Sequence, residues 1–260
     1  MTVHFVGAGP GAPDLLTLRG AALIARCPVV IFAGSLVPRA VVAHARPDAR
    51  VLDSAGMTLD EILAEMRDAH GRGEDVARVH TGDPLLFGST AEQMRRLDAL
   101  GIPYEVVPGV SSFSAAAAAL RRELTVPGVS QTVILARAAG RTPVPDGQDL
   151  ASLAGHRATL ALFLSAQHLD EAIAALAPAY GPDCPAAIVH RASWPDERVI
   201  RGRLGELAAL ARAEGVAATA MVLVGPALGA EGFPDSRLYA PEFGHAFRAA
   251  STPPATEGEG

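Results

Sequence analysis

Short apolar runs and amphipathic stretches follow one another along the chain, and this succession predicts alternating strands and helices. Apolar runs bounded by Gly, Pro or polar residues predict strands at 2–7, 28–32, 50–52, 76–80, 104–107, 132–136, 159–164, 186–190 and 220–224, with a hairpin or edge segment at 194–202. Apolar positions at helical spacing predict helices at 17–26, 38–45, 58–72, 168–180 and 204–214. Two further helices are predicted, one that ends at about residue 100 and one that ends at about residue 122. Strands that alternate with helices indicate an α/β protein with open sheets.

Two domains are predicted from the breaks in this pattern. The 260 residues suit one large or two small α/β domains. We place the boundary between 108 and 126, and assign 1–115 to an N-terminal α/β domain and 116–247 to a C-terminal α/β domain. Residues 248–260, which are rich in Ala, Thr, Pro, Gly and Glu, are predicted to form a disordered tail.

The segment from Arg78 to Gly88 has the features of a ligand-binding loop. Its apolar strand stops at Thr-Gly-Asp-Pro (81–84), and open α/β sheets bind ligands beyond the carboxyl ends of their strands. Gly82 lets the backbone approach a ligand closely, and Asp83 places a carboxylate at the mouth of the crevice. Taken alone, the same residues also suit an ordinary strand-to-helix turn in which Asp83 caps the helix.

Composition excludes several kinds of chemistry and partner. The net charge is −6 without a long basic block, so we expect no nucleic-acid partner. Every basic residue is Arg, and the absence of Lys excludes Schiff-base chemistry and a phosphate-loop Lys. No apolar run reaches the roughly 18 residues of a membrane span, and the first strand begins at Thr2 without a leader, so we expect a cytoplasmic protein. Two widely spaced cysteines and scattered histidines predict no metal site.

A Gly-rich loop after the first strand leaves a dinucleotide site as one alternative. Gly7-x-Gly9-x-x-Ala12 satisfies the loose fingerprint of nicotinamide and flavin enzymes. Pro10 and Pro13 each remove a backbone amide that a pyrophosphate would need, and 28–36 contains no acid for a ribose hydroxyl. The sequence therefore favours a different ligand for this loop.

Three motifs together resemble the tetrapyrrole methylase family, whose members methylate corrins and porphyrins. They are GAGPG at 7–11, GDP at 82–84 and VPGVSS at 107–112, in the order and spacing of the family, and the similarity covers residues 2–245. Finer features resemble the branch that methylates carbon 11 of precorrin-4: AGSLV (33–37), SAGM (54–57), VHTGDP (79–84), QTVILARA (131–138), RTPVP (141–145), ALFLS (161–165) and ASWPDE (192–197). The branch that methylates uroporphyrinogen carries an acid where Ala33 stands here.

The resemblance implies two αβα domains with S-adenosylmethionine in the cleft between them, S-adenosylhomocysteine as its product, and a homodimer. Family contacts carried over by position imply these cofactor-binding residues: Pro10, Thr81, Gly82, Asp83, Leu86, Ser111, Ser112, Leu164, Ala192 and Ala220. The contacts implied in the second domain depend on the backbone. Methyl transfer is an in-line displacement that needs positioning and exclusion of water, so no general base is required and no catalytic residue is assigned.

Candidate substrate-binding residues follow from their places at predicted strand ends and loops. Ser35 and Met57 lie on first-domain loops expected to face the substrate, and His80 ends the strand before the Asp83 loop. Arg137, Arg141 and Arg191 lie at or near strand ends of the second domain, where they could bind the carboxylates of a tetrapyrrole. Trp194 is interpreted as a packing residue of its hairpin.

The functional hypothesis is an S-adenosylmethionine-dependent methyltransferase that converts precorrin-4 to precorrin-5 in cobalamin biosynthesis. Alternatives within the family are cobalt-precorrin-4, another corrin position, or the diphthamide precursor on a protein. An alternative from a different class is a redox or non-enzymatic module that binds a dinucleotide at Gly7 to Ala12.

Overall fold

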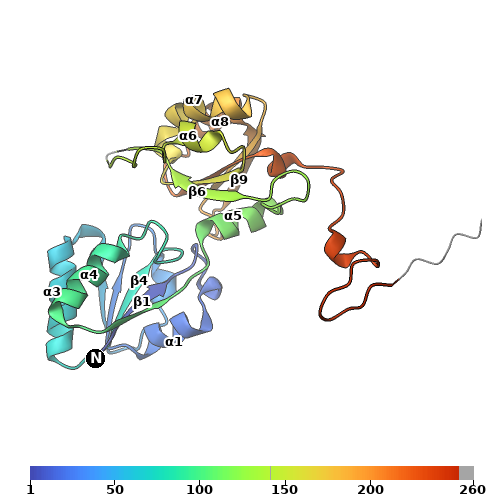
Figure 1. Cartoon of the computed structure of the whole chain (residues 1–260). Helices are drawn as coiled ribbons and strands as arrows, with labels where there is room; N and C mark the ends of the chain where they lie inside the picture. Colours follow the sequence, from blue (N-terminus) through green and yellow to red (C-terminus); the bar gives the residue numbers. More distant parts are fainter. Residues whose placement is uncertain (141, 252–260) are drawn as a thin grey trace, which may run out of the picture.

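The computed structural model describes residues 1–140 and 142–251, which form two α/β domains with α5 lying between them (Figure 1). The first domain is built on a parallel five-stranded sheet in the order β3-β2-β4-β1-β5. Its strands are β1 (Val3–Gly7), β2 (Val29–Phe32), β3 (Arg50–Asp53), β4 (Val76–His80) and β5 (Tyr104–Val107).

Helices cover both faces of the first sheet because alternate strand residues are apolar on each side. One face, which includes Val6 and Val30, packs against α1 (Leu18–Arg26) and α2 (Arg39–Val42). The other face packs against α3 (Leu59–Gly71) and α4 (Thr90–Leu100). The carboxyl ends of all the parallel strands meet at the edge of the sheet that faces the second domain (Figure 1).

The second domain has a mixed five-stranded sheet in the order β6-β7-β10-β8-β9. Its strands are β6 (Val133–Arg137), β7 (Thr159–Phe163), β8 (Pro185–His190), β9 (Arg198–Arg203) and β10 (Ala220–Val224). β10 runs antiparallel to both of its neighbours, so its amino-terminal end lies beside the carboxyl ends of β7 and β8.

The helices of the second domain are divided between the two faces of this sheet. α6 (Leu150–Ala154), α7 (Leu169–Tyr180) and α8 (Leu207–Ala213) share one apolar core with it. The Ala-rich α5 (Ser112–Leu120) packs on the opposite face, where its small side chains lie against β7, β8 and β10. The αβα architecture of both domains is thereby confirmed.

Most elements lie where the apolar pattern predicts them, with a few differences. α3 begins with a capping box, in which the Thr58 amide donates to the Glu61 carboxylate at 2.7 Å. α6 was not predicted because its five residues are too few to show a period. The predicted boundary after residue 115 falls inside α5, whose core contacts are with the second sheet.

The predicted tail from residue 248 is described only in part. Arg248 donates hydrogen bonds to the carbonyl oxygens of Leu238, Tyr239, Ala240 and Phe243, whereas 252–260 lie outside the described residues. Within the described ranges, no helix has the length and apolar character needed to cross a membrane. The same ranges contain no group of His, Cys, Asp and Glu side chains arranged to hold a metal ion.

Candidate active site

Three glycines from the three sequence motifs pack backbone against backbone at the carboxyl edge of the first sheet. A Cβ atom on Gly109 would lie 2.2 Å from the carbonyl oxygen of Gly82 and 2.7 Å from Cα of Gly7. A Cβ atom on Gly7 would lie 2.5 Å from Cα of Gly109. Contacts this close leave no room for any side chain, so the motifs that are distant in sequence meet through bare backbone.

Asp83 joins two of these loops with its carboxylate. Oδ1 accepts a hydrogen bond from the Leu85 amide at 2.9 Å, and Oδ2 accepts one from the Gly109 amide at 3.1 Å. Gly82 in turn exchanges backbone hydrogen bonds with Gly9, at 2.8 and 3.3 Å. Asp83 therefore holds its own loop against the loop after β5, and α4 begins later at Thr90, so Asp83 is not a simple helix cap.

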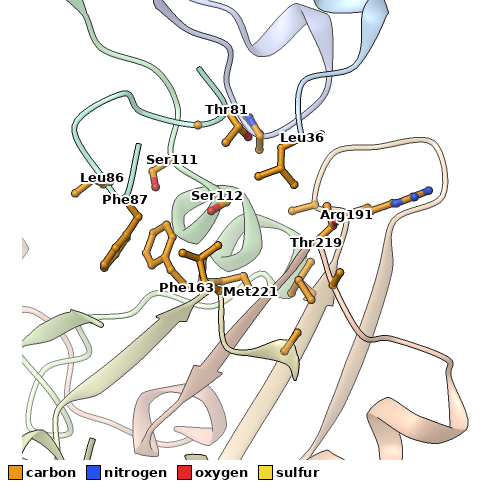
Figure 2. A pocket seen from close by; sticks show the side chains of 18 of the residues that line it. Leu36, Thr81, Leu86, Phe87, Ser111, Ser112, Phe163, Arg191, Thr219 and Met221 are labelled. Carbon is orange, nitrogen blue, oxygen red and sulfur yellow. The ribbon is translucent and has the colours of Figure 1, made fainter. Parts of the chain in front are cut away.

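A cavity of about 420 Å³ lies between this edge and the second domain, as Figure 2 shows. The first domain contributes the loops after β1, β2, β4 and β5, and the second contributes the ends of β7, β8 and β10. Apolar side chains such as Leu36, Phe163 and Met221 form much of the wall. Its volume and mixed character are typical of sites for small molecules.

Every residue that the resemblance implies for the cofactor lines this cavity. These residues are Pro10, Thr81, Gly82, Asp83, Leu86, Ser111, Ser112, Leu164, Ala192 and Ala220. Two of the candidate substrate residues, Ser35 and Arg191, line it as well. Sequence positions that lie as far apart as 10 and 220 are thus brought to one cavity.

Polar groups in the wall are few, and one of them is buried without a partner among the described residues. The Ser111 hydroxyl is buried and has no hydrogen-bond partner in the described structure, and a buried unpaired hydroxyl is unfavourable unless a ligand or water binds it. Arg191 directs its guanidinium away from the centre of the cavity (Figure 2) and pairs with Asp196 at 2.5 Å. Asp83 and Arg191 are the ionisable residues among the described residues that line the cavity.

Four of the eight non-glycine residues with positive φ among the described residues line the cavity. Phe87, Leu164, Arg191 and Thr219 all line it and all have φ between 49° and 55°, in the left-handed region that side chains other than glycine rarely adopt. Strained conformations of this kind occur mainly at binding sites, where contacts with the surrounding structure hold the backbone in place. Leu164 is 65% exposed, so its conformation is not explained by burial of its side chain.

Two candidate substrate residues of the first domain lie away from the cavity. His80 points to the opposite face of β4 from Val79, because side chains alternate along a strand, and its ring lies 5.9 Å from that of Phe5. Desolvation, followed by the charge of Arg78, lowers the pKa of His80 to about 3. Met57 packs against the apolar core beneath α3 and α4.

The two Arg residues predicted near β6 as substrate ligands are Arg137, which the structure describes, and Arg141, which it does not. Arg137 donates to the carbonyl oxygens of Ala138, Thr142 and Pro143, so its guanidinium holds its own loop. It lines a separate cavity of about 190 Å³ that shares Leu164 with the larger one. Arg141 lies outside the described residues.

Several cavity residues were not predicted from the sequence. Leu36 belongs to the AGSLV motif and Phe87 to the segment 78–88, and this membership was the available signal. Ala217, Ala218 and Thr219 precede β10 and enter the cavity because that strand is antiparallel to its neighbours. The direction of a strand within a mixed sheet is not encoded in its apolar pattern.

The Gly-rich loop does not have the form of a dinucleotide cradle. A 3-10 turn (Pro13–Leu15) and the extended Leu16 separate it from α1, so the amino terminus of α1 does not directly follow the loop. The Ala12 amide is already paired, because it donates to the Ser193 hydroxyl at 3.0 Å.

Known proteins share both the sequence and the fold. The sequence profile of the Tetrapyrrole (Corrin/Porphyrin) Methylases matches residues 2–208. The chain is 52% identical to the precorrin-4 C(11)-methyltransferase of Pseudomonas aeruginosa over 248 residues, which cover 95% of this chain and 99% of the relative.

Solved structures agree with this result. The X-ray structure of a cobalamin biosynthetic enzyme, cobalt precorrin-4 methyltransferase, has a TM-score of 0.85 and 44% identity, covering 87% of this chain and 95% of that one. The uroporphyrin-III C-methyl transferase of Thermus thermophilus complexed with S-adenosylhomocysteine has a TM-score of 0.71 and 30% identity, covering 88% and 93%.

Proposed function

Because the chain belongs to the tetrapyrrole methylase family, we propose that it transfers a methyl group from S-adenosylmethionine to carbon 11 of precorrin-4, giving precorrin-5 in cobalamin biosynthesis. The identity of 52% to a precorrin-4 C(11)-methyltransferase, over nearly the full length of both chains, supports precorrin-4 as the acceptor. The observation that carries the donor assignment is the interdomain cavity, which gathers all the residues implied for cofactor binding.

The cavity suits S-adenosylmethionine on physical grounds. This molecule combines an adenine, which favours apolar walls, with an amino-acid end that needs polar partners, and it has no phosphate. The apolar side chains of Leu36, Phe163 and Met221 and the unpaired hydroxyl of Ser111 match these two requirements. A loop that loses amides to Pro10 and Pro13 would bind phosphate poorly, but it is not handicapped for this ligand.

The residues of the cavity would act by positioning and by excluding water. When bound, S-adenosylmethionine supplies an electrophilic methyl group on a sulfonium with an excellent leaving group. The Asp83 carboxylate keeps the loops after β4 and β5 together, so the floor of the cavity is rigid before the ligand arrives. The apolar walls remove water from the reacting groups.

We propose three further features at a finer level. The acceptor is metal-free precorrin-4, because the chain is 52% identical to the enzyme named for that acceptor and 44% to the solved cobalt precorrin-4 methyltransferase. Ser35 and Arg191, which line the cavity, are the candidate substrate residues that the geometry supports, and Arg137 and Arg141 stay predictions. The protein works as a homodimer in the cytoplasm.

Calorimetric titration with S-adenosylhomocysteine tests the cofactor, with NADH as the control ligand. We expect the wild type to bind S-adenosylhomocysteine and not NADH. Asp83→Asn removes the negative charge of a carboxylate that accepts two backbone hydrogen bonds, each worth about 1.5–3 kcal/mol. We therefore expect the affinity for S-adenosylhomocysteine to fall by about tenfold or more. Asp60→Asn is the matched control, because Asp60 is 80% exposed on α3 and pairs only with Arg96 among the described residues.

Methyl-transfer assays with labelled S-adenosylmethionine then identify the acceptor. Precorrin-4, cobalt-precorrin-4 and uroporphyrinogen III should be compared at equal concentration, and we expect label in precorrin-4 at the highest rate. Binding of NADH without S-adenosylhomocysteine would refute the cofactor, and faster labelling of another acceptor would refute the substrate.

A further inference from the structure

The Gly-rich loop and the ASWPDE motif meet across the interdomain cleft. The indole Nε1 of Trp194 donates a hydrogen bond to the carbonyl oxygen of Pro10 at 2.9 Å. The Ala12 amide donates to the Ser193 hydroxyl at 3.0 Å. Two successive residues of the second domain thus bind the backbone of one short loop of the first.

Gly11 makes this contact possible because it has no side chain. A Cβ atom at Gly11 would lie 2.0 Å from Nε1 of Trp194 and 2.1 Å from Cδ1, so any other residue would displace the indole. The indole edge lies directly against the bare backbone of Gly11. The loop that satisfies a nucleotide fingerprint therefore has a different physical use here, as the seat of a side chain from the other domain.

The turn that carries Trp194 is held rigidly on its own side. The Trp194 amide donates to the Arg191 carbonyl at 2.9 Å, and the Ser193 amide donates to the Glu197 carboxylate at 2.6 Å. The Arg191 guanidinium carbon lies 5.1 Å from the centroid of the Trp194 ring, and the guanidinium is anchored by Asp196. Because the side chain is held rigidly on its own domain, its contact with Gly11 fixes the position of the second domain relative to the first.

Both partners of this contact adjoin the cavity, although Trp194 does not line it. Pro10 forms part of the wall, and so do Arg191 and Ala192, which precede Trp194 on the same turn. A second interdomain contact, Phe87 on Phe163 with ring centroids 4.7 Å apart, lies within the wall itself. Trp194 is therefore an interdomain anchor that can be changed without touching a bound ligand.

We propose that Trp194, seated on Gly11, is a positioning residue that sets the separation of the two cavity walls and thereby the affinity for the cofactor. The identity of the cofactor rests on the proposed function, whereas the contact itself does not. Loss of the contact leaves the lining residues of each domain unchanged within that domain but allows the second domain to move relative to the first. The effect should therefore appear in ligand affinity and in the environment of Trp194 together.

A double-mutant cycle on binding of S-adenosylhomocysteine tests this proposal. Gly11→Ala should weaken binding by at least about tenfold, because the new methyl group displaces the indole. Trp194→Ala should weaken it by about tenfold, and adding Gly11→Ala to Trp194→Ala should change it by less than about threefold, because the clash no longer exists. Gly71→Ala, at the end of α3 with open space around it, is the control and should bind like the wild type.

The fluorescence of Trp194 gives an independent readout, since it is the single Trp of the chain. Gly11→Ala should shift its emission to longer wavelength and raise its quenching by acrylamide, while Gly71→Ala should change neither. Trp194→Phe keeps an aromatic ring without the N–H group, and should weaken binding by about threefold to tenfold while remaining folded.

The outcomes separate the two proposals. If the wild type binds S-adenosylhomocysteine but Gly11→Ala and Trp194→Phe bind it equally well, the role of Trp194 is refuted and the proposed function stands. The role of Trp194 would also be refuted if Gly11→Ala reduced the affinity for S-adenosylhomocysteine by the same factor in the wild type and in the Trp194→Ala variant. If the wild type does not bind at all, the proposed function fails and the positioning role fails with it.

Discussion

Replacing Gly109 with Ala tests whether the three motif glycines are required for packing. The added Cβ would lie 2.2 Å from the carbonyl oxygen of Gly82, about 1.2 Å short of the 3.4 Å at which ordinary van der Waals contact begins. The obstacle is backbone, which has no rotamer to change. The loops after β4 and β5 would therefore have to separate.

The size of the effect follows from two contributions. Overpacking of this kind typically destabilises by about 1–3 kcal/mol. Separation of the loops also stretches the hydrogen bond of 3.1 Å from the Gly109 amide to Asp83, and a bond to a charged group is worth about 1.5–3 kcal/mol. We expect Gly109→Ala to lower the free energy of unfolding by about 3–5 kcal/mol, which most proteins survive only marginally.

Urea unfolding followed by circular dichroism measures this loss, and calorimetry with S-adenosylhomocysteine measures its effect on the site. Gly71→Ala is the matched control: it lies at the end of a helix in open space, and should be neutral or stabilising by up to about 1 kcal/mol. If the free energy of unfolding of Gly109→Ala is within about 1 kcal/mol of the wild-type value, close packing of the glycines does not constrain these loops.

Two other predictions concern single residues near the site. The pKa of His80 is about 3 in the fold and lies below that of an unfolded His, so the unfolded state binds the proton first and stability should fall between about pH 6.5 and pH 3, by at most about 1.4 kcal/mol per pH unit. His80→Gln should flatten this acid slope in urea unfolding at pH 7 and pH 5, and an unchanged slope would contradict the assignment. Leu164 has φ of 53° and is 65% exposed, so Leu164→Gly should be more stable than Leu164→Ala by about 1 kcal/mol, the reverse of the usual order, as measured by thermal unfolding. Equal stability of these two variants would show that the backbone at this position is not strained.

Local features were predictable because their causes lie within a few residues. The helices predicted from residues 17 and 58 have Thr17 and Thr58 as their caps, and each Thr side chain accepts a hydrogen bond from the amide of the third residue that follows. The apolar runs of the strands are equally local. α6 escaped prediction although Asp149 caps it, because five residues show no period.

The set of residues around the cavity was predicted from motifs, and a general property of α/β sheets explains why they meet. Loops that follow neighbouring parallel strands emerge at the same edge, so Thr81, Asp83 and Ser111 come together once β1, β4 and β5 are paired. The face that a strand-end residue occupies was harder to predict. His80 is one residue before Thr81, and this single step places it inside the core of the first domain.

The sequence by itself determined the alternation of strands and helices, their caps and the family, because these depend on neighbouring residues and on motif spacing. Only the tertiary structure decided which distant groups touch. It placed Trp194 on Gly11, directed Arg137 to the carbonyl oxygens of its own loop, and brought Thr219 into the cavity through the reversed direction of β10. Such contacts depend on the packing of two domains, and local patterns of residues along the chain do not reveal a distance across the cleft between them.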